Sequence, residues 1–187
     1  MLITICADST IVFPLSMLHF CMYLNASGSD GKVESVKVDM GAPILEAEKV
    51  PVNTAVLKPA DGENAVINQP LVVDGKSYNV TCVSMGNPHA IVYLDNDIDI
   101  KKFELEKIGP GFEKHEAFPE QVNTEFIQVV DRKNLNMRVW ERGSGETLAC
   151  GTGACASLVA TVLNGMCDDE ATQIGRASCR ERVFITV

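Results

Sequence analysis

The sequence predicts an α+β domain in which many short strands form a barrel around one central, buried helix. Residues 153–163 are small or apolar around nearly the whole circumference of a helix, which is typical of a buried helix. The residues before them form short β-rich runs separated by Gly, Pro, Asn and Asp. The 187 residues, 46% of them hydrophobic, suffice for one domain or two small lobes. A helix wrapped by strands leaves few exposed strand edges, so we expect a closed or nearly closed sheet.

The first half of this domain reads as strands and one hairpin. Residues 33–40 alternate between apolar and polar side chains, and residues 49–52 form a second short strand before a loop that contains Pro and Gly. Residues 71–83 give the clearest local signal, because Asp74-Gly75 suits the positive φ angles of a type I′ turn between two β-rich arms. Residues 90–94 form the next apolar strand.

The second half contains both predicted helices. Residues 97–115 are charged with interspersed apolar side chains, which predicts an exposed amphipathic helix that breaks near Gly109-Pro110. Residues 124–130 and 136–140 follow as strands, and Asn164-Gly165 ends the buried helix.

The two ends differ from the middle, so we expect a single domain over residues 28–173. Residues 1–27 are largely apolar, but no basic residue precedes Lys32, and Asp8, Pro14 and His19 interrupt any spanning stretch. We therefore expect neither a signal peptide nor a membrane helix there. Residues 174–187 have no apolar period and resemble one translated frame of a sequencing adapter, which predicts a non-native tail. A basic surface tail is the alternative.

Charge and cysteine content exclude several function classes. The chain has 25 acidic and 16 basic residues and a net charge of −9, which makes nucleic acid an unfavourable partner. Its seven cysteines are odd in number and irregularly spaced, unlike a secreted disulfide framework, and their spacing with three scattered histidines does not suit a structural metal site. We expect a cytoplasmic protein with no metal, no cofactor and no membrane partner.

The densest chemical signal is the glycine-rich segment that leads into the buried helix. The backbone N–H groups of Gly151 and Thr152 open that helix, and helix N-termini bind anions. Cys150 immediately precedes them, where the helix dipole favours a thiolate that acts as a base or nucleophile. The alternative is a small core cysteine with glycines needed for tight packing, which is the interpretation we favour for Cys155. The segment lacks the Gly-Lys-Ser/Thr ending of a phosphate-binding loop.

Charged and polar residues near this segment suit an α-amino acid. Arg142 offers a two-point grip on a carboxylate and Glu141 a partner for an ammonium group, although such a pair is more often solvated surface charge. Asn87 and His89 lie in a turn between two strands, where Pro88 holds Asn87 extended. A lone histidine is as often structural as functional. Asn123, before a strand, would alone read as a turn residue.

Taken together, these residues resemble the C-terminal half of the diaminopimelate epimerase family, over about residues 31–172. The motifs that carry the resemblance are Gly86-Asn-Pro-His89, the stretch from Phe118-Pro119 to Asn123, Glu141-Arg-Gly143 and Ala149-Cys-Gly-Thr-Gly-Ala-Cys155. The resemblance implies two pseudo-symmetric lobes, each a barrel of strands around a central helix, with the substrate between them and homodimers as a frequent assembly. This chain would supply one lobe.

The resemblance also implies a function and roles for individual residues. It implies cofactor-independent, two-cysteine interconversion of LL- and meso-2,6-diaminopimelate in lysine biosynthesis, with Cys150 as one catalytic thiol and His89 and Glu141 tuning the thiols. Asn87, Asn123, Glu141 and Arg142 would contact the substrate, and the N–H groups of Gly151 and Thr152 would stabilise its developing negative charge.

One departure from the family pattern limits this expectation. The second cysteine of the family lies in an N-terminal Cys-Gly-Asn-Gly-like motif, and neither Cys6 nor Cys21 has such glycines. We therefore expect an incomplete, truncated enzyme that is inactive alone. The alternatives are a proline racemase-like or phenazine-biosynthesis-like isomerase, which differs in its substrate, and a non-catalytic amino-acid-binding lobe, in which Cys150 would be dispensable.

Overall fold

The computed structural model describes residues 2–6, 24–27, 35–176 and 180–184, with side chains described for residues 38–176. Two helices accompany the strands, α1 (Leu105–Glu113) and α2 (Gly151–Leu163). The described strands of the N-terminal part are β1 (Leu2–Cys6), β2 (Leu24–Ser27), β3 (Ser35–Asp39), β4 (Gln69–Val73), β5 (Lys76–Ser84) and β6 (Pro88–Tyr93). Those of the C-terminal part are β7 (Asn123–Asp131), β8 (Asn134–Glu141), β9 (Gly145–Thr147), β10 (Glu170–Ile174) and β11 (Arg180–Phe184).

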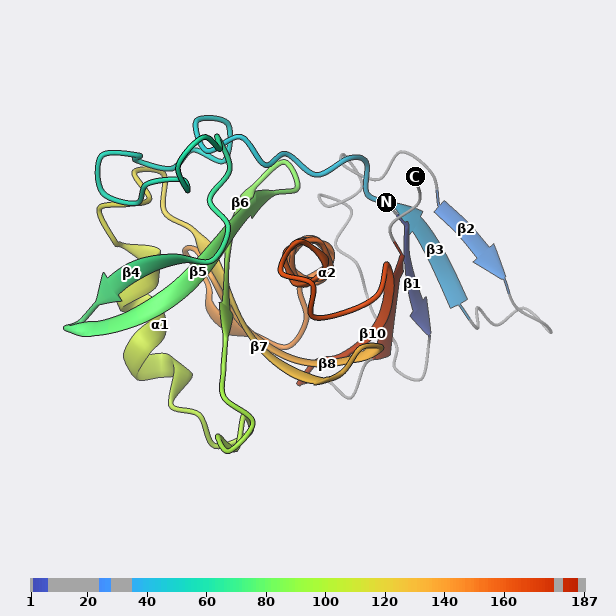
Figure 1. Ribbon diagram of the computed structural model, residues 1–187. Coiled ribbons are helices and arrows are strands. Elements are labelled where there is room, and N and C mark those ends of the chain that lie inside the picture. The colour runs from blue at the N-terminus through green and yellow to red at the C-terminus, as the bar shows by residue number, and fades with distance from the viewer. Residues whose placement is uncertain (1, 7–23, 28–34, 177–179, 185–187) are drawn as a thin grey trace.

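All eleven described strands belong to one mixed sheet. Its order is β2-β3-β1-β11-β10-β8-β7-β6-β5-β4, with β9 paired to β8 as a short hairpin. The pairs β6–β7 and β8–β10 are parallel, and the other described pairs are antiparallel. The strands curve around α2, which is seen end-on in Figure 1. The α+β class and the central helix are thus confirmed, but the described order has two ends, β2 and β4, so the sheet is not a closed barrel.

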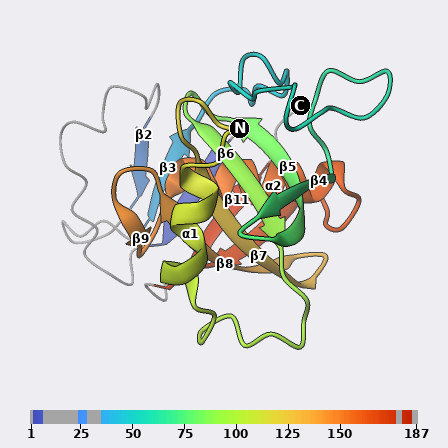
Figure 2. The same ribbon diagram turned by 90° about the vertical axis from the view of Figure 1, so that its left-hand side faces the viewer.

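The two helices cover opposite faces of the sheet, each above its own apolar core. On one face, α1 contributes Leu105 and Phe112 to a core that includes Val80, Ala90 and Phe126. On the other face, the small side chains of α2 pack against a different set of strand residues, which are Val83, Ile91, Ile127, Leu135 and Met137. Figure 2 shows α1 on the near side of the sheet, with α2 behind the strands.

Side chains alternate between the two faces along each central strand, and this alternation positions the polar residues of interest. On β7, Phe126 faces α1 and Ile127 faces α2, so the odd-numbered Asn123 and Glu125 also face α2. On β6, Ile91 faces α2, and His89 shares its face. On β8, Leu135 and Met137 face α2, which places Glu141 on the same side.

Several predicted elements are confirmed. The hairpin is β4–β5, and its turn has positive φ at both central residues, 49° at Asp74 and 80° at Gly75, as a type I′ turn requires. Strands β6, β7 and β8 match the predicted strands with small shifts at their ends, and β3 matches the described part of residues 33–40. Helix α2 is buried from Gly153 to Thr161, as predicted.

The predicted strand over residues 49–52 is wrong. The backbone N–H of Val50 donates to the Glu46 carbonyl at 3.1 Å, and that of Val52 donates to the Ala47 carbonyl at 2.7 Å. These local hydrogen bonds make consecutive turns, so the N–H groups are satisfied without a neighbouring strand. Val50 and Val52 are nevertheless buried in the core under α1.

The helix predicted over residues 97–115 is shorter and is not broken where expected. Turns precede it, because the Asp99 side chain accepts the Lys101 N–H at 3.1 Å and so competes with helical bonding. The helix then runs through Gly109 and Pro110 without interruption. Gly109 serves close packing, since a Cβ at this position would collide with the indole of Trp140.

The two ends that the sequence set apart contain described strands. Strand β1 pairs with β3 and β11, and β11 also pairs with β10. The origin of residues 174–187 and the status of residues 1–27 therefore stay predictions, and the genomic DNA on both sides of the domain would test them. Residues 1, 7–23, 28–34, 177–179 and 185–187 lie outside the described part. Among the described residues, no helix is long and apolar enough to span a membrane.

Candidate active site

Cys150 occupies the N-cap position of α2, as the glycine-rich segment predicted. Its backbone is extended (φ −142°, ψ 106°), and its Sγ accepts the N–H of Gly153 at 3.4 Å. The Thr152 hydroxyl lies 3.5 Å from the same sulfur. Within the described part of the chain, no acceptor contacts the backbone N–H of Gly151 or of Thr152. The helix therefore presents two unoccupied N–H donors beside a thiol.

The thiolate expected at Cys150 is not what the structure favours. Burial raises the pKa of the Cys150 thiol well above its usual range, and the carboxylates of Glu125 and Glu141 raise it further. The hydrogen bonds from Thr152 and Gly153 lower this pKa, but by less. The helix N-terminus was the only influence visible in the sequence, whereas desolvation and two nearby negative charges oppose it. Burial and these two charges therefore favour the protonated thiol over the thiolate at Cys150.

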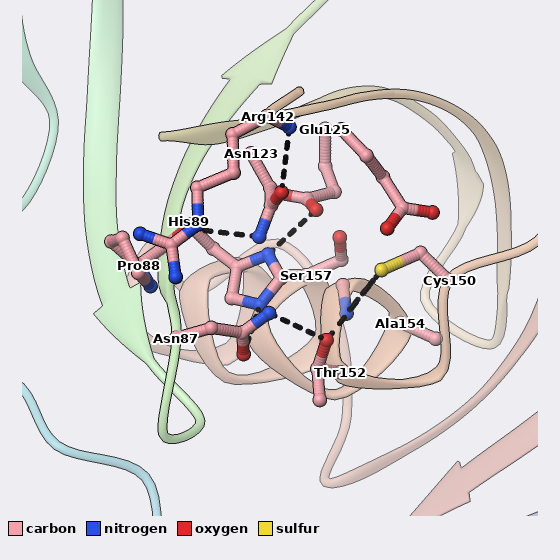
Figure 3. A network of polar contacts seen from close by, with 12 residues as sticks. Asn87, Pro88, His89, Asn123, Glu125, Arg142, Cys150, Thr152, Ala154 and Ser157 are labelled. Carbon is pink, nitrogen blue, oxygen red and sulfur yellow. Dashed lines mark hydrogen bonds and ion pairs between the residues drawn. The ribbon is translucent and has the colours of Figure 1, made fainter. Parts of the chain in front are cut away.

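His89 and Asn87 approach the same helix start from β6 and from the turn before it. The Nε2 of His89 lies 3.0 Å from the Asn87 Oδ1, and the Asn87 Nδ2 donates to the Thr152 Oγ1 at 3.3 Å. His89 is fully buried, and its Nδ1 lies 2.7 Å from the Oε1 of Glu125. Figure 3 shows these side chains together with Cys150 at the end of α2.

Asn123 joins two parts of the site through its amide. Its Nδ2 donates to the Pro88 carbonyl at 3.2 Å, and its Oδ1 accepts the backbone N–H of Arg142 at 3.0 Å. Its side chain is buried, with 2% exposed. Asn123 is thus more than the turn residue that it resembles in isolation, because it fixes the Asn87 turn relative to the Arg142 turn.

Glu141 and Arg142 end β8 at the edge of the site. The Thr147 hydroxyl, on β9, donates to the Glu141 Oε1, which orients that carboxylate. The Arg142 guanidinium donates from Nη1 to the Glu120 carbonyl at 3.1 Å. Behind this turn, Glu113 of α1 accepts the Trp140 Nε1–H at 2.7 Å and the Gly143 N–H at 2.8 Å. Glu141 and Arg142 are both half-buried, so they are not the fully solvated surface charges of the alternative interpretation.

Glu125 is the site residue that the sequence analysis missed. It is fully buried, and its charge acts on Cys150. A signal for it exists in the sequence, because Glu125 lies two residues after Asn123 and so shares its face, and the apolar Phe126 and Ile127 follow it directly. A charged residue at such a position of a buried strand requires a partner.

The structure therefore brings six of the eight predicted site residues to the α2 N-terminus, and Asn123 links the turn that holds Arg142 to the Asn87 turn. Among the described residues, no group of three His, Cys, Asp or Glu side chains is arranged to hold a metal ion. What the site offers is a thiol, two carboxylates, an imidazole, a guanidinium and two backbone N–H groups.

The motif pattern has a counterpart in known proteins. The family model of diaminopimelate epimerase matches residues 81–177, which is more than half of the chain and includes every residue of the site. The chain belongs to the diaminopimelate epimerase family. The resemblance found in the sequence is thereby confirmed at the level of the family.

Curated relatives named diaminopimelate epimerase support this membership. The chain is 55% identical to the protein of Acetivibrio thermocellus over 149 residues, which is 80% of this chain and 50% of that protein. It is 54% identical to the protein of Nostoc punctiforme over 166 residues, 84% of this chain and 56% of that one. The chain thus spans about half the length of the curated relatives that it matches.

A solved structure shows a much weaker likeness. A Clostridium difficile protein described as a phenazine biosynthesis PhzC/PhzF protein aligns with a TM-score of 0.37 and 18% identity, over 51% of this chain and 33% of that one. This similarity is too low to support an argument about fold or function.

Proposed function

We propose that this chain forms one lobe of a cofactor-independent diaminopimelate epimerase, which interconverts LL- and meso-2,6-diaminopimelate in lysine biosynthesis. The observation that carries the proposal is the position of Cys150, a buried thiol at the N-cap of α2 with unoccupied N–H donors beside it. Membership of the diaminopimelate epimerase family supports the choice of substrate. The proposal includes a cytoplasmic location, as the charge and cysteine content predict, and a homodimer, as the resemblance implies.

Inversion at an α-carbon needs two groups, because a single base tends to return the proton to the face from which it came. In the proposed reaction, one thiolate removes the α-proton while a thiol on the opposite face supplies another. The raised pKa of Cys150 suits the thiol that supplies the proton. The other thiol would come from outside residues 28–173, since the cysteines there other than Cys150 are Cys82, Cys155 and Cys167.

The negative charge that develops when the α-proton leaves spreads onto the substrate carboxylate. The N–H groups of Gly151 and Thr152 are fixed at the helix start and need no reorganisation to meet this charge. Arg142 would bind a carboxylate, and Glu141 would bind the ammonium group of the same amino acid. The Asn87 amide lies within reach of the same helix start, whereas Asn123 holds the Arg142 backbone in place.

The test restores a complete enzyme and then removes one thiol. The N-terminal half of the Acetivibrio thermocellus relative, fused to this chain, should convert LL- to meso-diaminopimelate and incorporate deuterium at the α-carbon in D2O. Cys150→Ala should abolish both. Cys155→Ala is the matched control, because Cys155 lies one turn further along α2, fully buried in the core.

Three results would contradict the proposal. Conversion by the fusion that carries Cys150→Ala would exclude Cys150 as an acid–base group and favour a non-catalytic binding lobe. Measurable conversion by the purified 187-residue chain alone would show that one lobe with one such thiol suffices. A fusion that accepts only amino acids with a single stereocentre, such as proline, would favour a racemase of different substrate class.

A further inference from the structure

Glu125 is a buried carboxylate for which the proposed reaction has no role. Its Oε1 lies 2.7 Å from the His89 Nδ1, and both side chains are fully buried. Within the described part of the chain, its Oε2 has no hydrogen-bond partner. The carboxylate lies against the first turn of α2, where a Cβ at Gly153 would collide with it. Burying an ionised carboxylate costs free energy unless the carboxylate is paired with a cation. A residue that is kept at such a cost requires an explanation.

A continuous series of hydrogen bonds leads from Glu125 to the sulfur of Cys150 (Figure 3). It runs from the Glu125 Oε1 to the His89 Nδ1 (2.7 Å) and from the His89 Nε2 to the Asn87 Oδ1 (3.0 Å). It continues from the Asn87 Nδ2 to the Thr152 Oγ1 (3.3 Å), and ends between the Thr152 Oγ1 and the Cys150 Sγ (3.5 Å). We call this series the Glu125–Cys150 chain.

The contacts of the Glu125–Cys150 chain allow one direction in which every donor points toward the sulfur. When both ring nitrogens of His89 carry a proton, Nδ1 donates to the Glu125 carboxylate and Nε2 donates to the Asn87 Oδ1. The Asn87 amide then donates to Thr152, which leaves the Thr152 hydroxyl proton for the sulfur. A sulfur that accepts from Thr152 and from Gly153 is stabilised as a thiolate.

The opposite direction is equally complete. If the Asn87 amide turns over, its Nδ2 donates to a neutral His89 Nε2 and its Oδ1 accepts the Thr152 hydroxyl proton. The Thr152 oxygen then accepts the S–H of Cys150, so this direction stabilises the thiol. The Glu125 carboxylate accepts the Nδ1–H of His89 in both cases, but it favours the imidazolium and hence the first direction.

We propose that Glu125 is a positioning residue for the Cys150 thiol, acting through His89, Asn87 and Thr152 by setting the direction of the hydrogen bonds that reach the sulfur. This inference deepens the proposed function, because an acid–base group must be stable both with and without its proton. The Glu125–Cys150 chain supplies one direction for each state.

The negative charge of Glu125 has a direct effect of opposite sign, which makes the proposal testable. The sulfur faces carboxylates from β7 and β8, those of Glu125 and Glu141, and the charge of each raises its pKa. If charge alone mattered, Glu125→Gln would lower the pKa of Cys150 and accelerate its alkylation. If the chain of hydrogen bonds dominates, the same substitution removes the partner of the imidazolium, turns the series toward the thiol and slows alkylation.

The experiment measures alkylation of Cys150 by iodoacetamide in the full 187-residue chain, across neutral and alkaline pH. Fragment mass spectra distinguish Cys150 from Cys155, and the fully buried Cys155 reports any loosening of the fold. We expect Glu125→Gln to slow alkylation of Cys150 at a fixed pH by about three- to tenfold, the loss expected for one hydrogen bond of ordinary strength. Glu48→Gln, an exposed carboxylate outside the site, is the control and should change nothing.

A second variant interrupts the series while leaving Glu125 in place. Thr152→Val should also slow alkylation, because it removes the hydroxyl donor, and its half-buried position makes a folding defect avoidable. In the Thr152→Val background only the direct charge of Glu125 remains, so adding Glu125→Gln should now accelerate alkylation. This reversal of sign is a coupling that a merely structural role of Glu125 would not produce.

Either of two results would overturn the proposal: faster or unchanged alkylation in Glu125→Gln, or an unchanged rate in Thr152→Val. If Glu125→Gln loses the near-ultraviolet circular dichroism of Trp140, the single Trp of the sequence, the Thr152→Val result alone decides. These measurements do not depend on epimerase activity. A negative result in the alkylation measurements would not contradict the proposed function, and a negative result in the epimerase test would not change the alkylation rates.

Discussion

The two faces of the sheet pack against different types of side chain. Under α1, the rings of Tyr78, Phe103, Phe112 and Phe126 contact one another with centroids 5.1 to 5.5 Å apart. Under α2, the helix contributes mainly Ala, Cys and other small side chains, and polar groups such as His89, Glu125 and Gln173 are buried beside it. Large rings bury apolar area, whereas small side chains let a helix start come close to polar groups on the strands. The α1 face is therefore built for stability, and the α2 face holds the candidate active site.

The strongest test of this difference is Phe112→Ala. Phe112 is fully buried and contacts two other rings, so its removal should lower the free energy of unfolding by about 3–5 kcal/mol. Urea denaturation would measure this loss, with Val72→Ala, at a 59% exposed position of β4, as a control expected within about 0.5 kcal/mol of the original chain. If the surviving folded protein showed altered Cys150 alkylation, the two faces would not be independent.

A pair of helix glycines gives the next largest effect and separates the faces directly. A Cβ at Gly109 would collide with Trp140 under α1, and a Cβ at Gly153 would collide with Glu125 beside Cys150. Each substitution to Ala should cost about 1–3 kcal/mol of stability through overpacking. Only Gly153→Ala should change the alkylation rate of Cys150, and an equal change in Gly109→Ala would contradict the comparison.

Glu113 supplies a smaller, pH-dependent contribution on the α1 side. Burial raises the pKa of its carboxyl, but the hydrogen bonds from Trp140 and Gly143 outweigh burial and hold this pKa below its ordinary value. A lowered folded-state pKa stabilises the fold above the unfolded pKa, and this stabilisation is lost as the pH falls through the folded value. Glu113→Gln should therefore cost about 1–2 kcal/mol at neutral pH and progressively less below about pH 4. Denaturation curves at several pH values would measure it, and a pH-independent difference would exclude this explanation.

Gly151→Ala should have the smallest effect and sharpens the interpretation of Gly153. Among the described residues, no atom beyond the chain neighbours and the backbone of α2 itself lies within 4 Å of a Cβ built at Gly151, so Ala should fit at the start of α2. Because Ala has the higher helix propensity, we expect stability to stay equal or rise by up to about 1 kcal/mol. A clear loss of stability, measured by thermal unfolding, would mean that the first turn of α2 is more crowded than the structure shows.

The parts of the fold that the sequence predicts well are those governed by local chemistry. Asp74-Gly75 specifies its turn because few residue pairs tolerate positive φ twice, and α2 is recognisable because a helix that is apolar on all sides must be buried. The helix break predicted at Gly109-Pro110 is wrong, because Gly109 leaves room for the indole of Trp140, a residue 31 positions away in the sequence.

The site shows the same limit. The positions of Cys150, Gly151 and Thr152 follow from the motif, but the protonation of the thiol depends on Glu125 and Glu141, which approach from two different strands. A local pattern shows the helix dipole and not the desolvation that opposes it. Glu125 itself carries a local signal only through its alternation with Asn123.

The burial of Cys150 also bears on how long the protein stays chemically intact. Oxidants such as peroxide react with thiolates far faster than with thiols, and oxidation beyond the sulfenic acid is in general irreversible. With 7% of the residue exposed and the pKa of its thiol raised, Cys150 is shielded from this damage in the folded protein. The unfolded chain does not bury this thiol, so folding also protects the sulfur atom that this lobe would contribute to the proposed chemistry.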